Sequence, residues 1–241
     1  RQDRELVRRA DALYRKLLDH LKRSRQVYED QTGRRVVYGE HLDKAHEGLV
    51  FLFDPKGTRT FHTEQQGKGD AIVIGVRGLN PFWKGEVTSG GEMFDFAKKQ
   101  RGPIIHELTH HVDSIRFPEG FAAAGESYPE EPDGERYFNH ALELNAYFIQ
   151  ALADTTEQIE ETLSEIVADD PDSGSHQAAV WELHDWMDEN DDFRKFRKRF
   201  WRSLRRQVKE NLTEKNKRRF DSRLYDTWDK LRDEANQVWA D

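Results

Sequence analysis

Apolar residues recur along the chain with two different spacings, which predict two kinds of secondary structure. Residues 3–28 place an apolar residue every three or four positions, without glycine or proline, and predict an amphipathic helix. Four short runs rich in β-branched and aromatic residues then predict strands, at 35–38, 49–53, 60–62 and 71–76. The turn sequence at 54–57 predicts that the second and third strands form a hairpin.

The remainder of the chain is predicted to be mostly helical. Helices are expected at 103–116 and 136–167, followed by two or three more, with loops rich in glycine and proline at 78–92 and 118–134. The order of one helix, a small sheet and then many helices predicts an α+β fold.

Composition narrows the kinds of chemistry that the chain can perform. Its 241 residues include no cysteine, so a metal ion would have to be held by His, Asp or Glu side chains. The net charge of −8 does not favour phosphate neutralisation, and no nucleic-acid partner is expected. No stretch is long and apolar enough to span a bilayer, so membrane insertion is not expected. Without a signal-peptide pattern, these features predict a cytoplasmic protein.

Charged residues are unevenly distributed in the second half of the chain. Residues 154–192 are strongly acidic, whereas residues 194–219 are rich in Lys and Arg. One interpretation is a pair of solvated helix faces that attract one another, and the other is a nucleic-acid or membrane patch at 194–206. The basic segment carries apolar side chains at helical spacing, which favours packing in a core: Phe193, Phe196, Phe200, Trp201, Leu204 and Val208.

The strongest chemical signal is the HELTH sequence at residues 106–110. Two histidines four positions apart lie on one face of a helix, where the imidazoles of His106 and His110 can bind one zinc ion. Glu107 then projects beside the ion, where it can take a proton from a zinc-bound water and pass it to the leaving group. The apolar neighbours Ile104, Ile105 and Leu108 predict a buried helix, and the alternative is a chance motif on an exposed one.

A catalytic zinc site needs a third protein ligand, and Glu143 is the best candidate. It lies on the helix predicted at 136–167, where the small Ala146 one turn later would let this helix approach the HELTH helix closely. Four other carboxylates are rival ligands: Glu126, Glu130, Glu131 and Glu135.

Three further features surround the predicted site. Asp113, one turn after His110, can accept the second imidazole N–H and fix the ring, or it can be an ordinary exposed residue near a helix end. His111 points about 100° away from His110 on a helix and is expected to pack or to support the site. The run at 71–76 is either a strand edge that binds an extended substrate or a plain core strand.

The HELTH motif with its downstream Glu143 resembles the gluzincins, which are zincin peptidases with two His ligands and one Glu. Within this group, the run from His106 to Asp113 and the Glu143-Leu-Asn-Ala element resemble lethal-factor-like and Pro-Pro-endopeptidase-like peptidases. This resemblance implies a tyrosine that stabilises the developing oxyanion, with Tyr137 in that role and Tyr147 as its rival. Residues 211–225 bear a weaker resemblance to zincins encoded by phages and mobile elements.

These observations lead to one principal function and two alternatives. We expect a zinc metallopeptidase that acts on a polypeptide, with a zincin catalytic core at 1–150 and a helical subdomain at 151–241 packed on it. The first alternative is a non-catalytic zinc-braced structural or binding protein, such as a phage component, whose site is closed by His140 or Asp113. The second is a toxin or effector protease with a single host target. These alternatives would place the protein in a phage particle or outside the producing cell.

Overall fold

The computed structural model describes residues 2–23, 28–29, 34–46, 48–57, 59–65, 69–75, 90–129, 134–169 and 193–238. The chain separates into two compact units, one formed mainly by Arg4–Tyr128 and the other mainly by Pro129–Asp241. We call them the N-terminal and the C-terminal unit. Their boundary lies before the predicted one at residue 150, so the helix that carries Glu143 belongs to the C-terminal unit.

The N-terminal unit contains the strands and the HELTH helix. Its elements in chain order are α1 (Gln2–Arg23), β1 (Tyr28–Glu29), β2 (Arg35–Tyr38), η1 (Gly39–His41), η2 (Lys44–His46), β3 (Leu49–Asp54), β4 (Phe61–Gln65), β5 (Gly69–Gly75), α2 (Gly90–Lys99), α3 (Arg101–Arg116) and α4 (Pro118–Gly125). Most of the loop predicted at 78–92 lies outside the described residues, and its last residues begin α2.

The strands form one mixed sheet with the order β1-β2-β3-β5-β4. β5 pairs in parallel with β3 and antiparallel with β4, which lies at the edge of the described sheet. The predicted hairpin between β3 and β4 is therefore wrong. Ala71, Ile72, Val73 and Ile74 of β5 are at most 2% exposed, so this strand takes an interior position and leaves the more polar β4 at the edge. For residues 71–76 the core-strand interpretation is confirmed, over the part that the structure describes.

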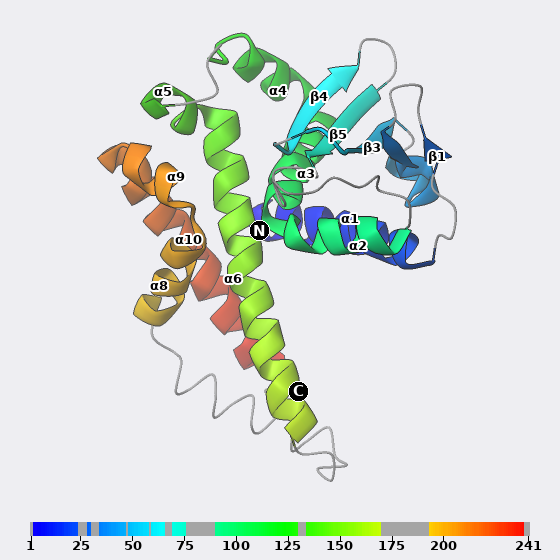
Figure 1. The fold of residues 1–241 in the computed structure, drawn as a ribbon. Helices are drawn as coiled ribbons and strands as arrows, with labels where there is room; N and C mark the ends of the chain where they lie inside the picture. The colour runs from blue at the N-terminus through cyan, green and yellow to red at the C-terminus, as the bar shows by residue number, and fades with distance from the viewer. Residues whose placement is uncertain are drawn as a thin grey trace. The chain divides into compact units, whose positions relative to one another are not determined.

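The HELTH helix α3 packs against β4 and β5 (Figure 1). His62 on β4 and Asp70 on β5 point to the same face of the sheet as the buried Ile72, because side chains alternate along a strand. His111 of α3 meets this face, with its Nδ1 2.6 Å from Asp70 Oδ2. The sheet therefore holds two polar side chains directly against the HELTH helix.

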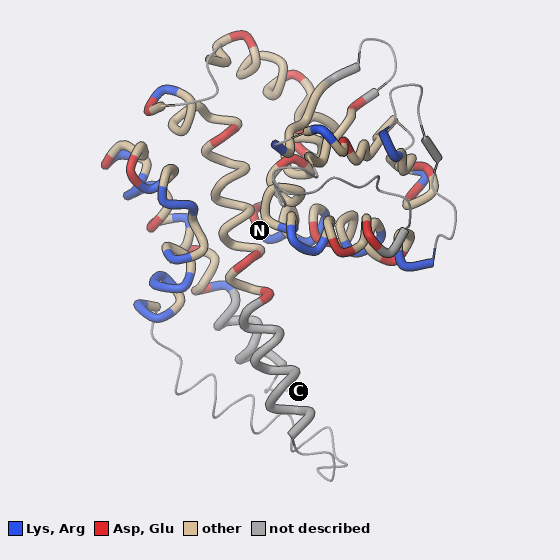
Figure 2. Tube along the Cα trace, in the orientation of Figure 1, with Lys and Arg blue, Asp and Glu red and all other residues tan. Residues whose placement is uncertain are grey.

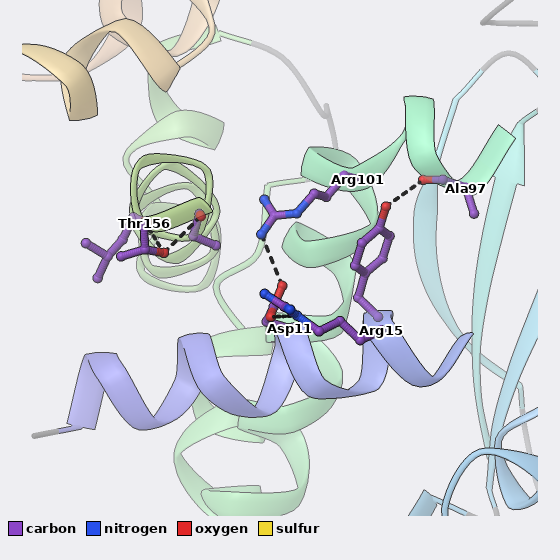
Figure 3. A network of polar contacts seen from close by, with 8 residues as sticks. Asp11, Arg15, Ala97, Arg101 and Thr156 are labelled. Carbon is purple, nitrogen blue, oxygen red and sulfur yellow. Dashed lines mark hydrogen bonds and ion pairs between the residues drawn. The ribbon is translucent and has the colours of Figure 1, made fainter. Parts of the chain in front are cut away.

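Polar contacts join the three long helices of the N-terminal unit (Figure 3). Arg101 Nη2, at the start of α3, donates to Asp11 Oδ1 on α1 at 3.1 Å. Arg15 Nε donates to the other oxygen of Asp11 at 2.6 Å. The Tyr14 hydroxyl of α1 donates to the Ala97 carbonyl of α2 at 3.3 Å. These contacts fix the start of α3 relative to α1 and α2.

Residues 118–125 form helix α4, which corrects the loop predicted at 118–134. Pro118 stands in the first turn, where its missing N–H breaks no helical hydrogen bond. The following Phe-Ala-Ala-Ala run has high helix propensity, and it outweighs the glycines that flank it. Glycine and proline therefore mark the two ends of this helix instead of preventing it.

Gly75 ends β5 where another part of the backbone comes close. A Cβ at this position would lie 2.6 Å from both Arg59 N and Arg59 O. Backbone atoms cannot easily move away, so Gly75→Ala is expected to lower the free energy of unfolding by about 1–3 kcal/mol. Gly125→Ala, at the end of α4, is the control because no atom lies within 4 Å of its Cβ. Urea unfolding followed by circular dichroism measures both, and equal effects would contradict the close approach.

Helices are the only regular secondary structure in the described residues of the C-terminal unit. Its elements are α5 (Gly134–Phe138), α6 (Ala141–Asp169), α8 (Phe193–Ser203), α9 (Arg206–Asn211) and α10 (Glu214–Val238). The helix predicted at 136–167 is divided between α5 and α6 at Asn139. The side chain of Asn139 donates to the Asn211 carbonyl at 2.7 Å and accepts from the Thr213 backbone N–H at 2.9 Å. Asn139 thus ends α5 and holds the connection between α9 and α10.

Aromatic side chains form the core of the C-terminal unit. The ring centroid of Phe148 on α6 lies 5.2 Å from that of Phe200 on α8 and 5.2 Å from that of Phe220 on α10. Phe196 and Phe200 are buried, which confirms that the apolar side chains of the basic segment pack in a core. The Lys and Arg residues of this basic segment are concentrated along α8 and α9 (Figure 2).

The α+β class predicted from the sequence is confirmed, with a small mixed sheet in the N-terminal unit and a helical second half. Within the described residues, no helix combines the length and the apolar character that crossing a membrane requires.

Candidate metal centre

The helix α3 presents its two motif histidines from a largely buried position. Pro103 lies in the first turn, where a missing N–H is tolerated. Ile104, Ile105 and Leu108 are fully buried and anchor the helix in the N-terminal unit. His106 and His110 are only 5% and 7% exposed. The predicted burial is therefore confirmed, and the alternative of surface histidines on an exposed helix is wrong.

The two imidazoles face one another across one turn of α3. His106 Nε2 and His110 Nε2 are 3.3 Å apart, and the ring centroids are 5.0 Å apart. Two nitrogens bound to one tetrahedral zinc at ~2.05 Å would lie ~3.3 Å from each other. A hydrogen bond between two neutral rings gives a similar distance. The separation of the two nitrogens is therefore compatible with one shared zinc ion.

Glu107 is held between α3 and the edge strand β4. Its Oε2 accepts a hydrogen bond from the His62 backbone N–H at 3.0 Å. The Glu107 residue is only partly buried. One oxygen of Glu107 is thus fixed by the sheet, and Glu107 directly follows the buried His106 in the sequence.

The remaining predicted site residues lie in three places. Asp113 is half-buried on α3, one turn after His110, and its contact with an imidazole stays a prediction. Glu143 and Tyr147 lie on α6 and Tyr137 on α5, all in the C-terminal unit. Glu143 and Tyr147 are buried and Tyr137 is half-buried. Their roles as third ligand and as oxyanion donor stay predictions.

The rival ligands differ from Glu143 in burial. Glu126 follows α4 and Glu135 lies on α5, and both are exposed. Glu130 and Glu131 lie outside the described residues. A buried carboxylate is a better metal ligand than an exposed one because water competes less for it. Burial thus favours Glu143 over Glu126 and Glu135.

His111 lies beside the motif but faces away from it, as its position on the helix predicts. Its Nδ1 is 2.6 Å from Asp70 Oδ2, and its Nε2 is 3.0 Å from His46 Nδ1. His62 Nε2 is 3.4 Å from the same Asp70 oxygen. Sequence reasoning missed His46, His62 and Asp70, because η2, β4 and β5 bring them together and no local spacing marks them.

Comparison of the chain with protein-family models, with curated proteins and with solved structures found no match.

Proposed function

We propose that the chain is a zinc-dependent peptidase with a zincin-like catalytic core, in which His106, His110 and Glu143 hold the zinc ion. The 3.3 Å separation of the two Nε2 atoms carries this proposal, because it matches the separation of two nitrogens on one tetrahedral zinc. Glu143 enters from the sequence pattern and from its burial. The proposal requires α6 to bring Glu143 to the two histidines in the working enzyme.

Glu107 is the proposed general base and acid. When bound, zinc would acidify a coordinated water and polarise the scissile carbonyl. Glu107 takes a proton from the attacking water as the water oxygen bonds to the carbonyl carbon. It then gives this proton to the amine nitrogen as the C–N bond breaks. The His62 N–H holds Oε2, which leaves Oε1 for the proton transfer.

Two further elements complete the proposed active site. Tyr137 or Tyr147 would donate a hydrogen bond to the oxyanion that develops on the carbonyl. An extended polypeptide would lie along β4, since this strand forms the sheet edge and contacts Glu107 through His62. The substrate-binding strand edge that was considered for residues 71–76 is thus proposed to be β4.

Peptide cleavage that depends on zinc is the expected result of this proposal. A diverse peptide library is incubated with the zinc-loaded chain, and new termini are identified by mass spectrometry. Chelation should abolish cleavage, and added zinc should restore it, because the ion supplies the electrophile. The library with zinc alone is the control. A chain that binds zinc stoichiometrically but cleaves nothing would contradict the peptidase and favour the zinc-braced structural alternative.

A further inference from the structure

A second group of metal-ligand side chains lies where β4, β5 and α3 meet, outside the HELTH pair. His62, Asp70 and His111 each offer one ligand atom, and these three atoms lie within 4.8 Å of one another. We propose that these residues, which we call the sheet cluster, bind a second divalent metal ion. All three belong to the N-terminal unit, and each stands on a different element of regular structure. The backbone therefore holds the ligands in place before any ion arrives.

The charges in the sheet cluster favour a cation. The side chain of Asp70 meets two imidazoles, since its Oδ2 lies 2.6 Å from His111 Nδ1 and 3.4 Å from His62 Nε2. His62 Nε2 is buried and makes no hydrogen bond within the described residues. Imidazoles ligate metals in their neutral form, so a divalent ion would supply the positive charge that the Asp70 carboxylate needs.

His46 is positioned to support His111 as a ligand. A ligating histidine commonly donates its second ring N–H to an acceptor, which fixes the tautomer. His46 Nδ1 lies 3.0 Å from His111 Nε2. A hydrogen bond from His111 Nε2–H to His46 would leave Nδ1 of His111 for the ion, once the ion displaces the proton that joins Nδ1 to Asp70 Oδ2 across 2.6 Å. The opposite tautomer would make a metal-free hydrogen-bond chain.

The ligand set indicates the class of ion. Two imidazoles and one carboxylate suit zinc, cobalt, manganese or ferrous iron, whereas calcium and magnesium prefer oxygen ligands alone. His62 and Asp70 keep side-chain exposures of 14% and 18%, so water can fill the remaining coordination positions. An ion here would tie the edge strand to α3. It would also steady Glu107, which accepts from the backbone of His62. The proposed metal binding at the sheet cluster does not depend on the chain being a peptidase.

The test removes the first site and counts the metal that remains. The full chain with both His106→Ala and His110→Ala is freed of metal with a chelator and then titrated with Co²⁺ and with Zn²⁺ by calorimetry. We expect one equivalent to bind. Adding Asp70→Asn should weaken this binding more than about 100-fold, since loss of a ligand exceeds the effect of losing a supporting contact. Adding Asp95→Asn, an exposed residue of α2, should change nothing.

The outcomes separate this proposal from the proposed function. If the doubly substituted chain binds no more metal than its Asp70→Asn derivative, the sheet cluster is a hydrogen-bond chain and the proposal is wrong. If the doubly substituted chain does not fold, the same count is made in the unsubstituted chain. Asp70→Asn must then remove one equivalent, and an unchanged count overturns the proposal. If only the HELTH site fails to bind metal, the unsubstituted chain still binds one equivalent of metal, and Asp70→Asn removes it.

Discussion

Glu107→Gln is expected to lower kcat/KM for peptide cleavage by about 10²–10⁴-fold while zinc stays bound. The amide keeps the shape of the side chain and can still accept the His62 N–H that holds Oε2. It cannot take a proton from water, so the loss would fall on the chemical step. The measurement compares steady-state cleavage of one library-derived peptide with metal content determined on the same samples.

The control for this substitution is Glu119→Gln on α4. Glu119 is exposed and belongs to the same unit, so its activity should equal that of the unsubstituted chain. A Glu107→Gln protein that binds zinc and cleaves at the full rate would show that Glu107 is not the base. Loss of zinc together with activity would instead mean that Glu107 serves the metal site.

Glu143→Ala is expected to weaken zinc binding at the HELTH site more than about 100-fold, because a catalytic zinc has three protein ligands and would lose one. Activity should fall with occupancy and recover only in part at high zinc. The affinity is measured by competition with a chromophoric chelator. Zinc bound at the sheet cluster is removed from the comparison by making the substitution in the Asp70→Asn chain.

Glu135→Ala is the matched control for the third ligand, since Glu135 is a rival carboxylate that lies exposed on α5. It should leave the zinc affinity unchanged. If Glu143→Ala leaves the zinc affinity unchanged and Glu135→Ala lowers it, the third ligand is Glu135 on α5 instead. An unchanged affinity in both would leave Glu126, Glu130 and Glu131 as the candidates.

Local patterns were sufficient to predict most of the helices and the facing pair of histidines. The spacing of His106 and His110 is a property of one helix, so their facing nitrogens follow from the sequence once the helix is recognised. The apolar spacing that predicts α1 and the β-rich runs that predict β2 to β5 are equally local. The α4 helix was not predicted because glycine and proline indicate breaks, although Pro118 and Gly125 stand at its two ends and Gly120 lies within its first turn.

Features that depend on strand order could not be predicted in the same way. The turn after β3 suggests a hairpin, yet the chain passes β4 to the outside and places β5 beside β3. The choice depends on the burial of both faces of β5, with Ile72 on one face and Val73 on the other, which is a property of the whole sheet. The meeting of His62, Asp70 and His111 depends on this order, and so it could not be read from any motif.

The most direct test of the account is the position of zinc in a crystal of the zinc-loaded chain, found by anomalous diffraction at the zinc edge. We predict an anomalous peak about 2.0–2.1 Å from Nε2 of both His106 and His110. Glu107 should lie beside this peak without ligating it. A zinc-loaded crystal with no peak between these two rings would contradict the proposed centre.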